Sequence, residues 1–468
     1  MLVDQAERQG GAVPIHGVTP QTLQALVATL PQVAAGYMAA RSYTADPGEV
    51  FLAPGESGTL CAVLIGVGEG RTQDPFVAGK LAKLLPEGTY SLAGGFDDPF
   101  LAALAFELGA YSFDRFRKPK VKEKGLPRLC VPDGVDAAGL HRVAEAIAMG
   151  RDLINRPTND LGPSAFEAAA REIAGAHGAE VTSILGEDLL AANFPMIHAV
   201  GRAAAEAPRL VDITWGRSDA PKVTLVGKGV CFDTGGLDIK PSSGMLLMKK
   251  DMGGAATALA LAAMIMDAKL PIRLRVLLPI VENSIAGNAF RPGDVLPSRK
   301  GLTIEVGNTD AEGRLILADA LALADEEAPQ LLFDFATLTG AARVALGPDL
   351  PPYYTMDDEL AGAIATHATA TNDPCWRMPL WEPYDKLLKS KVADLSNISG
   401  GSFAGSITAA LFLRRFVERA GAWAHFDVYG WTPTAKPGRP EGGEVQMAHA
   451  LFALLCERFP AAAGRSAP

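Results

Sequence analysis

The chain has 468 residues, more than one ordinary hydrophobic core accommodates, so we expect two domains. Hydrophobic residues make up 48% of the sequence and charged residues 21%, a balance typical of globular proteins. The formal net charge of −10 argues against non-specific binding to nucleic acid or to an anionic membrane surface, because both need a basic face.

The sequence predicts neither a signal peptide nor a membrane span. The N-terminal segment carries Asp4 and Glu7 and lacks an apolar core of signal-peptide length. The longest uncharged stretch near the middle, 252–266, is too short and too rich in glycine and alanine to cross a bilayer. The five cysteines are scattered and form no CxxC pair, which fits reduced thiols and a cytoplasmic location.

Residues 1–135 are predicted to form a smaller N-terminal α/β domain. The apolar run 60–67 is typical of a strand, and 99–108 of a helix. The glycine cluster that follows the strand, at positions 66, 68 and 70, could form a nucleotide loop, but it lacks the full spacing, so a plain turn is favoured. The basic run 118–124 is interpreted as a solvated loop. No residue of this domain is predicted to carry chemistry.

Residues 136–160 are expected to link the domains as a helix and a loop, because apolar residues recur at helical spacing up to Pro157. Residues 161–468 are expected to form the catalytic domain. Helices are predicted at 165–177, 253–267, 312–326, 406–419 and 445–458, and strands at 223–230, 272–281, 302–306, 331–335 and 424–429. This alternation predicts an α/β fold with a mostly parallel or mixed sheet covered by helices. Ligands bind beyond the carboxyl ends of such strands, where both charged segments described next are expected to lie.

The segment 307–318 carries two carboxylates and a guanidinium. In an extended backbone, residues two apart point the same way, so Asp310 and Glu312 can aim at one point. Arg314 is near enough to bind an anion beside it, and Gly307 and Gly313 are expected to let the backbone turn tightly. The pattern indicates a metal site, with a capped helix start and a surface ion pair as the alternative.

A second charged segment begins at the end of the strand predicted at 223–230. Lys228, Asp233, Lys240 and Asp251 stand there among glycines and apolar residues. Because isolated buried charges are costly, charges in such a setting are usually paired or bound to a metal.

These segments resemble the leucine aminopeptidases, or cytosol aminopeptidases, a family of two-metal exopeptidases. The matching runs are 226–229, 232–236, 239–241, 251–252 and the signature Asn-Thr-Asp-Ala-Glu-Gly-Arg-Leu at 308–315. The resemblance extends from about residue 155 to the C-terminus. It implies a cytoplasmic, metal-dependent aminopeptidase that acts on peptides with a free N-terminus, with a leucine-like preference. It also implies a homohexamer built from two stacked trimers.

The resemblance assigns five metal ligands for two divalent ions. Asp233 and Glu312 would bridge the ions, Lys228 and Asp251 would complete the tighter site, and Asp310 would complete the looser one. Lys228 would have to be neutral, so the ions would have to lower its pKa well below the free value of about 10.4. Hard oxygen ligands with one nitrogen suit Mn²⁺, Zn²⁺ and Mg²⁺. The ions would share a hydroxide that attacks the peptide bond.

No side chain in these segments is an obvious general base, and none of the seven histidines forms HExxH. The resemblance implies that Arg314 holds a bicarbonate ion, which relays the proton. Lys240 would stay protonated and stabilise the developing oxyanion. The alternative for Lys240 is an ordinary surface lysine, because a loop-like sequence follows it.

The resemblance also assigns Thr337, Leu338, Gly340 and Met248 to substrate binding. The alternative is that 336–342 is only a strand end and a turn. The segment 399–406 resembles a flexible segment that closes the first pocket.

Two other functions remain open. One is a different two-metal hydrolase, such as a phosphoesterase, although the histidine ligands common there are absent. The other is a scaffold or DNA-binding relative that lost catalysis. The intact ligand set argues against lost catalysis, and the net charge against nucleic acid.

Overall fold

The computed structural model describes residues 1–4, 11–118 and 125–460, so most of the predicted basic loop at 118–124 lies outside the described residues. The chain divides into two compact units. The first comprises Met1–Ala148 and Thr434–Glu441, and the second comprises Met149–Pro433 and Gly442–Pro468. Both units contain sheets and helices, so the predicted α/β class is confirmed.

The first unit is built on a six-stranded sheet of order β1-β6-β5-β2-β4-β3. All neighbours pair in parallel except β3, which runs antiparallel to β4. Its elements are β1 (Leu2–Val3), β2 (Val13–Val18), α1 (Pro20–Val27), α2 (Gln32–Ala40), β3 (Val50–Pro54), β4 (Leu60–Gly66), η2 (Gly70–Thr72), η3 (Val77–Lys83), β5 (Gly88–Gly94), α3 (Pro99–Ala110) and β6 (Pro127–Cys130), where η marks a 3-10 helix.

The second unit holds most of the helices of the described chain. Helix α4 (Ala137–Asn155) continues into it from the first unit. Its other elements are α5 (Pro163–Ala176), β7 (Glu180–Leu185), α6 (Asp188–Ala191), α7 (Pro195–Gly201), β8 (Arg209–Trp215), β9 (Lys222–Gly227), β10 (Gly229–Asp233), α8 (Ser242–Met245), η4 (Met248–Met252), α9 (Gly253–Asp267), β11 (Arg273–Asn283), β12 (Val295–Pro297), β13 (Thr303–Glu305), α10 (Glu312–Glu326), β14 (Leu331–Ala336), α11 (Gly340–Leu346), β15 (Pro352–Tyr354), α12 (Asp358–Ala370), β16 (Trp376–Arg377), η5 (Glu382–Leu388), β17 (Leu395–Ser396), α13 (Gly405–Arg414), β18 (Ala422–Asp427), β19 (Trp431–Thr432), β20 (Gly442–Gly443) and α14 (Ala448–Arg458).

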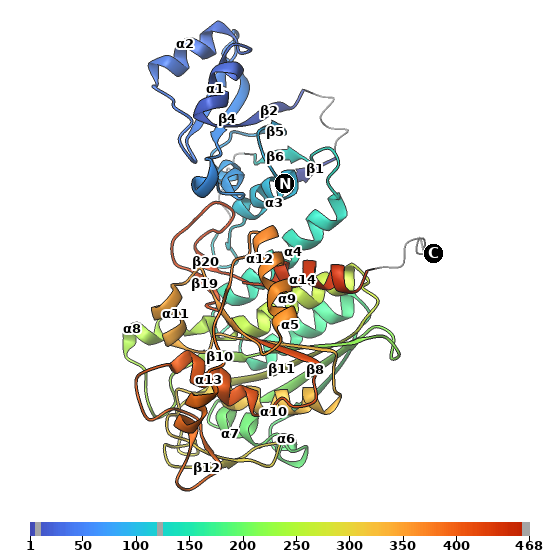
Figure 1. The fold of residues 1–468 in the computed structure, drawn as a ribbon, viewed down its shortest axis with the longest axis vertical. Helices are drawn as coiled ribbons and strands as arrows, with labels where there is room; N and C mark the ends of the chain where they lie inside the picture. Colours follow the sequence, from blue (N-terminus) through green and yellow to red (C-terminus); the bar gives the residue numbers. More distant parts are fainter. Residues whose placement is uncertain (5–10, 119–124, 461–468) are drawn as a thin grey trace. The chain divides into compact units, whose positions relative to one another are not determined.

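The main sheet of this unit has the order β16-β15-β18-β14-β9-β11-β8-β7, and β10 pairs with β11 beside that path. Its central strands are parallel, whereas β8 runs antiparallel to β11, and β7 runs antiparallel to β8. Helices α5 and α9 cover one face and α7 and α10 the other (Figure 1). The mixed sheet covered by helices therefore matches the prediction.

Three predicted elements differ from the structure. The strand expected at 223–230 is two strands, β9 and β10, which divide at Lys228. The strand expected at 302–306 is β13, which pairs with β12 and β17 in a separate small sheet and not in the main sheet. The helix expected at 406–419 ends at Arg414. The backbone amides of residues 415–417 then bond to carbonyls three residues back, and those of residues 418–420 donate to the carboxylate of Asp325.

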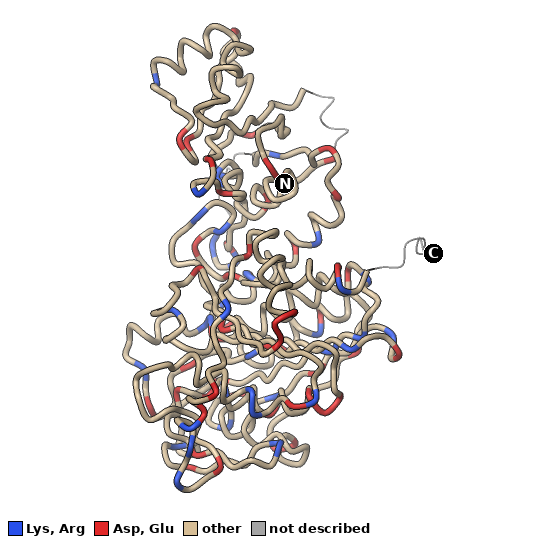
Figure 2. The backbone as a smooth tube through the Cα atoms, in the orientation of Figure 1, with Lys and Arg blue, Asp and Glu red and all other residues tan. Residues whose placement is uncertain are grey.

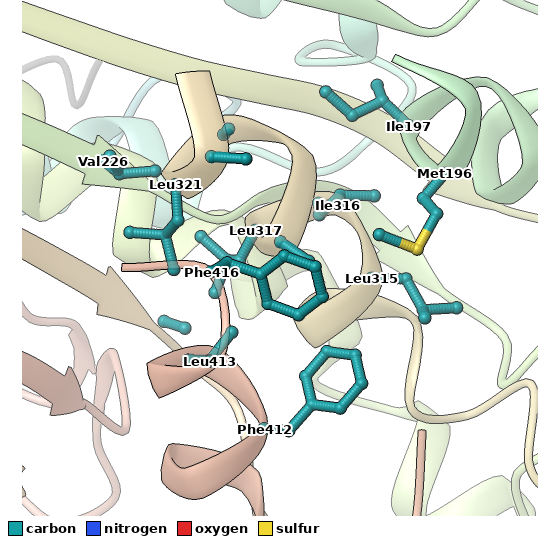
Figure 3. Packing of buried hydrophobic residues seen from close by; sticks show 14 of the residues in the cluster. Met196, Ile197, Val226, Leu315, Ile316, Leu317, Leu321, Phe412, Leu413 and Phe416 are labelled. Atoms are coloured by element: carbon teal, nitrogen blue, oxygen red, sulfur yellow. The ribbon is translucent and has the colours of Figure 1, made fainter. Parts of the chain in front are cut away.

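Helix α10 lies inside a large hydrophobic cluster. Its apolar side chains are buried on several sides of the helix, against Met196 and Ile197 of α7 and against Phe412 and Phe416 (Figure 3). Each fully buried leucine or isoleucine stabilises the fold by roughly 1.5–3 kcal/mol. The packing therefore fixes the helix whose first turn carries Glu312 and Arg314.

Acidic and basic residues are interspersed along the described chain, without a long stretch of one sign (Figure 2). Among the described residues, no helix has both the length and the apolar character needed to cross a membrane.

Candidate metal centre

Three carboxylates converge in the second unit. Ligand atoms of Asp233, Asp310 and Glu312 all lie within 4.8 Å of one another. Asp233 is the last residue of β10, Asp310 lies in the turn before α10, and Glu312 is the first residue of α10. The structure therefore brings together carboxylates that are about eighty residues apart in sequence.

The prediction that Asp310 and Glu312 share one side of an extended backbone is wrong in its geometry. Ala311 is the N-cap of α10, with φ −116° and ψ 41°, so Glu312 already belongs to the helix. The two carboxylates converge because the chain turns into the helix between them, not because a strand alternates. The Asn308 side chain holds this turn, since its Oδ1 accepts a 2.7 Å hydrogen bond from the Asp310 amide.

Gly313 and Gly307 are needed for space and not for a tight turn, which corrects a second expectation. Neither has a positive φ. A Cβ at Gly313 would lie 2.5 Å from Cε and 2.6 Å from Nζ of Lys228, and a Cβ at Gly307 would lie 2.7 Å from the Ile398 side chain. The glycine after Glu312 lets the lysine approach the helix.

A local irregularity in β10 sets the direction of Asp233. Lys228 and Asp233 are five residues apart, a spacing that a regular strand places on opposite faces. The register against β11 shifts between Val230 and Asp233, and this β-bulge adds one residue to the strand. The bulge restores Asp233 to the face that Lys228 shares with Val230.

Lys228 stands where β9 separates from β10. Its backbone amide donates to the Phe335 carbonyl at 2.9 Å, and its side chain is only 3% exposed. Nζ lies 2.8 Å from Asp251 Oδ2 and 2.9 Å from Glu312 Oε1, and it donates to the Thr337 carbonyl at 2.9 Å. Burial disfavours the charged form, but the carboxylates of Asp251 and Glu312 outweigh burial and raise the pKa of Lys228 above its ordinary value.

Lys240 is not a free surface lysine. Its side chain is 15% exposed, and Nζ forms ion pairs with Asp233 at 2.8 Å and with Asp310. Burial opposes the charged form, yet the carboxylates of Asp233 and Glu312 raise the pKa of Lys240. Lys240 is therefore a cation at neutral pH.

The crowding of acids perturbs the carboxyl groups as well. Burial and the neighbouring Asp233 raise the pKa of Glu312 to about 8 and that of Asp310 to about 6. Glu312 Oε2 is buried and has no hydrogen-bond partner among the described residues. A divalent cation favours the ionised carboxylates and gives that oxygen a partner, so the residues fit a site for divalent metal ions.

Arg314, two residues further along α10, is also buried. It donates from Nη1 to the Asn397 carbonyl at 2.6 Å, whereas its Nε has no partner among the residues that the structure describes. Burial lowers the pKa of this guanidinium to about 10. A buried guanidinium with an unused donor fits a small anion.

Three of the four residues predicted to bind substrate follow β14, and the fourth, Met248, begins η4. Thr337 is buried and donates from Oγ1 to Asp251 Oδ1 at 2.8 Å, and its carbonyl accepts from Lys228 Nζ at 2.9 Å. It therefore contacts two of the predicted metal ligands. Leu338 and Met248 are partly exposed, and Gly340 is exposed. The alternative of a strand end and a simple turn understates this segment, because α11 begins at Gly340 with Thr339 as its N-cap.

Two family models match the chain. Residues 148–452 match the catalytic domain of the cytosol aminopeptidase family, and residues 13–132 match the M17 aminopeptidase N-terminal domain. The chain belongs to the cytosol aminopeptidase family. It is accordingly a metal-dependent aminopeptidase, a hydrolase, as the resemblance implied.

Similar proteins agree with this assignment. The chain is 41% identical over 374 residues to a probable cytosol aminopeptidase of Nitratidesulfovibrio vulgaris, covering 76% of this chain and 73% of that protein. It is 37% identical over 457 residues to a probable cytosol aminopeptidase of Chlorobium limicola, covering 89% and 90%. The crystal structure of the cytosol aminopeptidase from Coxiella burnetii superposes with a TM-score of 0.92 at 45% identity, covering 98% of this chain and 99% of that one. The bottromycin maturation enzyme BotP in complex with Mn superposes at 0.84 and 31% identity, covering 95% and 99%.

Three buried residues that the sequence did not single out support the centre of this aminopeptidase. Asn283, the last residue of β11, donates from Nδ2 to Asp233 Oδ1 at 2.8 Å. Asn397 binds the loop before α10: its Oδ1 accepts from the Gly307 amide and its Nδ2 donates to the Asn308 carbonyl, both at 2.8 Å.

Asp427 holds the segment that follows β14. This fully buried carboxylate accepts hydrogen bonds from the amides of Leu338 and Thr339 and pairs with Arg343 at 2.9 Å. Asn283 and Asp427 are each the last residue of a strand of the main sheet, so polar residues at strand ends were a sequence signal for both. Asn397 offers no such signal.

Proposed function

We propose that this aminopeptidase removes N-terminal residues from peptides at the centre formed by Lys228, Asp233, Asp251, Asp310 and Glu312, which would hold two divalent metal ions. The single observation that carries the proposal is the convergence of the Asp233, Asp310 and Glu312 carboxylates, in which Glu312 Oε2 has no hydrogen-bond partner among the described residues. Asp251 joins them through its contact with Lys228 Nζ. Hard oxygen donors with one amine suit Mn²⁺, Zn²⁺ or Mg²⁺.

Lys228 and Asp251 would belong to one metal site and Asp310 to the other, and the carboxylates of Asp233 and Glu312 would contribute to both. When bound, the ions would supply a strong nucleophile from water and Lewis-acid stabilisation of developing negative charge. Their charge would also lower the pKa of Lys228, which the carboxylates alone raise, so that its amine could act as a ligand.

Two cations of the chain would assist the reaction. Lys240 would stabilise negative charge on the carbonyl oxygen of the scissile bond, because its raised pKa keeps it protonated and its Nζ already lies beside Asp233. Arg314 would hold a bicarbonate ion that moves the proton. The Nε of this buried guanidinium, which has no partner within residues 1–4, 11–118 and 125–460, supports an anion there.

Selectivity for a free N-terminus would come from Asp251 and one ion, which would bind the α-amine. Thr337, Leu338, Gly340 and Met248 would contact the first residue of the peptide, and the apolar side chains among them favour a leucine-like residue. Segment 399–406, in which the Phe403 side chain is 86% exposed, would close over that residue. We further propose that this protein assembles into a homohexamer and is located in the cytoplasm.

The test is hydrolysis of leucine p-nitroanilide at mildly alkaline pH. The protein is stripped of metal with a chelator and assayed before and after Mn²⁺ or Zn²⁺ is restored. We expect metal-dependent release by the wild type and a loss of at least 1,000-fold in Glu312→Ala. Glu326→Ala is the matched control, because Glu326 ends the same helix and pairs with Arg299 away from the centre.

Activity in Glu312→Ala equal to that of the control would refute the ligand assignment. Absence of release from leucine, alanine, proline and acidic anilides with any metal would refute the proposed substrate class. Bicarbonate removal should lower the rate of the wild type, whereas Arg314→Gln should be slow with or without bicarbonate.

A further inference from the structure

Two residues of the glycine cluster in the first unit, Gly68 and Gly70, line a cavity that the proposed peptidase reaction does not use. The cavity has a volume of about 700 Å³ and lies at the carboxyl ends of β2, β4 and β5. Sites for small molecules typically have volumes of about 300–1,000 Å³, so the cavity is large enough for a ligand of moderate size. All of its lining residues belong to the first unit.

The sheet topology places this cavity where α/β sheets bind ligands. Strand β2 lies between β5 and β4 and is parallel to both. The chain leaves β2 toward β4 on one side and then crosses to β5 on the other, so the carboxyl end of β2 is a topological switch point. Loops diverge at such a point and leave a crevice between them.

Glycines hold the walls of the crevice close together. A Cβ at Gly95, which has φ +79°, would lie 1.8 Å from the Gly17 carbonyl oxygen, so the loop after β5 is pressed against the end of β2. A Cβ at Gly68, which has φ +74°, would lie 2.3 Å from the Thr72 carbonyl oxygen. Gly94, by contrast, faces open space where its Cβ would be. The walls are tightly packed while their inner surface stays open.

The charge of the lining limits the ligand class. Glu69 and Asp97 supply two carboxylates, and the described lining residues include no lysine or arginine. Burial lowers the pKa of His16, the remaining ionisable side chain of the lining, so that it is neutral near pH 7. A phosphate would be repelled here, whereas hydroxyl groups can donate to the carboxylates. Asp97 Oδ2 already accepts a 2.5 Å hydrogen bond from the Gln73 Nε2 amide, which leaves its other oxygen to accept from a ligand.

The lining also offers an apolar surface for a ring. Val18, Leu26, Val67 and Phe96 line the cavity together with the acids. Acidic side chains near the carboxyl ends of strands bind ribose hydroxyls in other doubly wound folds, and aromatic side chains pack against planar rings. We propose that the first unit binds an uncharged nucleoside in this cavity, its sugar hydroxyls on Glu69 and Asp97 and its base against the apolar wall.

The experiment is calorimetric titration of the full-length, metal-loaded protein with adenosine, uridine and their 5′-monophosphates. We expect saturable binding of at least one nucleoside and at least tenfold weaker binding of its monophosphate. Ala93→Phe should abolish the binding, because the exposed Ala93 side chain at the end of β5 lines the cavity. Ala39→Phe, on an exposed position of α2 outside the lining, is the matched control.

Glu69→Gln and Asp97→Asn should each weaken nucleoside binding about tenfold and reduce the discrimination against the monophosphate, whereas Glu56→Gln in the exposed turn between β3 and β4 should change neither. Aminopeptidase activity of Ala93→Phe should equal that of wild type, which shows that the second unit is intact. No binding of any nucleoside at millimolar concentration would overturn the proposal. Tighter binding of the monophosphate, or unchanged binding in Ala93→Phe, would overturn it as well.

Discussion

Asn397 offers a sharp test of how the loop carrying Asp310 and Glu312 is held. The side chain is fully buried and makes two short hydrogen bonds, with the Gly307 amide and the Asn308 carbonyl, both at 2.8 Å. Two longer bonds, with the Asn308 amide at 3.3 Å and the Ala311 carbonyl at 3.4 Å, complete its contacts with the loop.

The expected cost of Asn397→Ala follows from these four bonds. A net hydrogen bond contributes about 1 kcal/mol, and an unsatisfied buried partner costs about 1–3 kcal/mol. Gly307 is exposed and Asn308 is partly exposed, so water can reach the released groups and the lower values apply. We therefore expect a loss of about 2–3 kcal/mol in the free energy of unfolding, two short bonds at about 1 kcal/mol each and a smaller share for the long ones.

The same substitution should weaken metal binding. Residues that orient metal ligands typically contribute 10- to 100-fold in metal affinity. Urea unfolding and calorimetric titration with Mn²⁺ measure the two effects. Asn397→Asp keeps the acceptor for the amides but places an oxygen against two carbonyls, so it should be no better than alanine.

Asn288→Ala is the control, since Asn288 makes one exposed bond of 2.8 Å to the Arg202 carbonyl outside the centre. It should cost less than about 1 kcal/mol and leave Mn²⁺ affinity unchanged. If Asn397→Ala loses less than about 1 kcal/mol and binds Mn²⁺ normally, the loop is held by something else.

Three further predictions concern the rest of the second unit. Burial lowers the pKa of His449 to about 4, so the imidazole is protonated in the unfolded chain, but not in the folded protein, once the pH falls below about 6.5. The free energy of unfolding should therefore fall by about 2 kcal/mol between pH 7 and pH 5 because of this group. Urea unfolding of His449→Gln should lack that part of the loss. Arg151→Met leaves the buried Glu444 carboxylate without the cation 2.8 Å away and should cost about 3–5 kcal/mol by urea unfolding, most of which Arg151→Met combined with Glu444→Leu should recover. Leu317→Ala opens a cavity in the α10 cluster and should cost about 2–5 kcal/mol, whereas a loss below about 1 kcal/mol would mean that the cluster collapses around it.

Much of the fold of the second unit follows from local pattern. The bounds predicted for α9 and α10 are those of the structure, because each helix has a continuous apolar run between clear ends. Strands β7 and β8 were not predicted, although they form one edge of the main sheet. The alternation of apolar and polar residues is interrupted in both, by Thr182–Ser183 in β7 and by Leu210–Val211 in β8, so neither strand shows a clear two-residue period.

The metal centre shows a different limit on what the sequence can predict. The sequence selected Lys228, Asp233, Asp310 and Glu312 as site residues because they are charged and stand among glycines and apolar residues. The structure brings these side chains together. Their directions depend on two features that the sequence pattern did not show. One is a bulge in β10 that is defined only by pairing with β11, and the other is the turn at Ala311, which interrupts the extended backbone expected between Asp310 and Glu312. Asn397 reaches the loop from about ninety residues away, and no periodicity reports such a contact.

Gly313 has a consequence for engineering. Replacing helical glycines with alanine is a standard way to stabilise a protein, and it commonly contributes up to about 1 kcal/mol per site. At position 313 the added methyl group would occupy the volume held by the Lys228 amine, at the end of the chain that contacts Glu312. The gain from a helical alanine is therefore opposed at this position by displacement of the buried Lys228 amine from Asp251 and Glu312, so Gly313→Ala should lower the melting temperature. A design rule based on helix propensity alone would choose this substitution, whereas the contact between the helix and Lys228 argues against it.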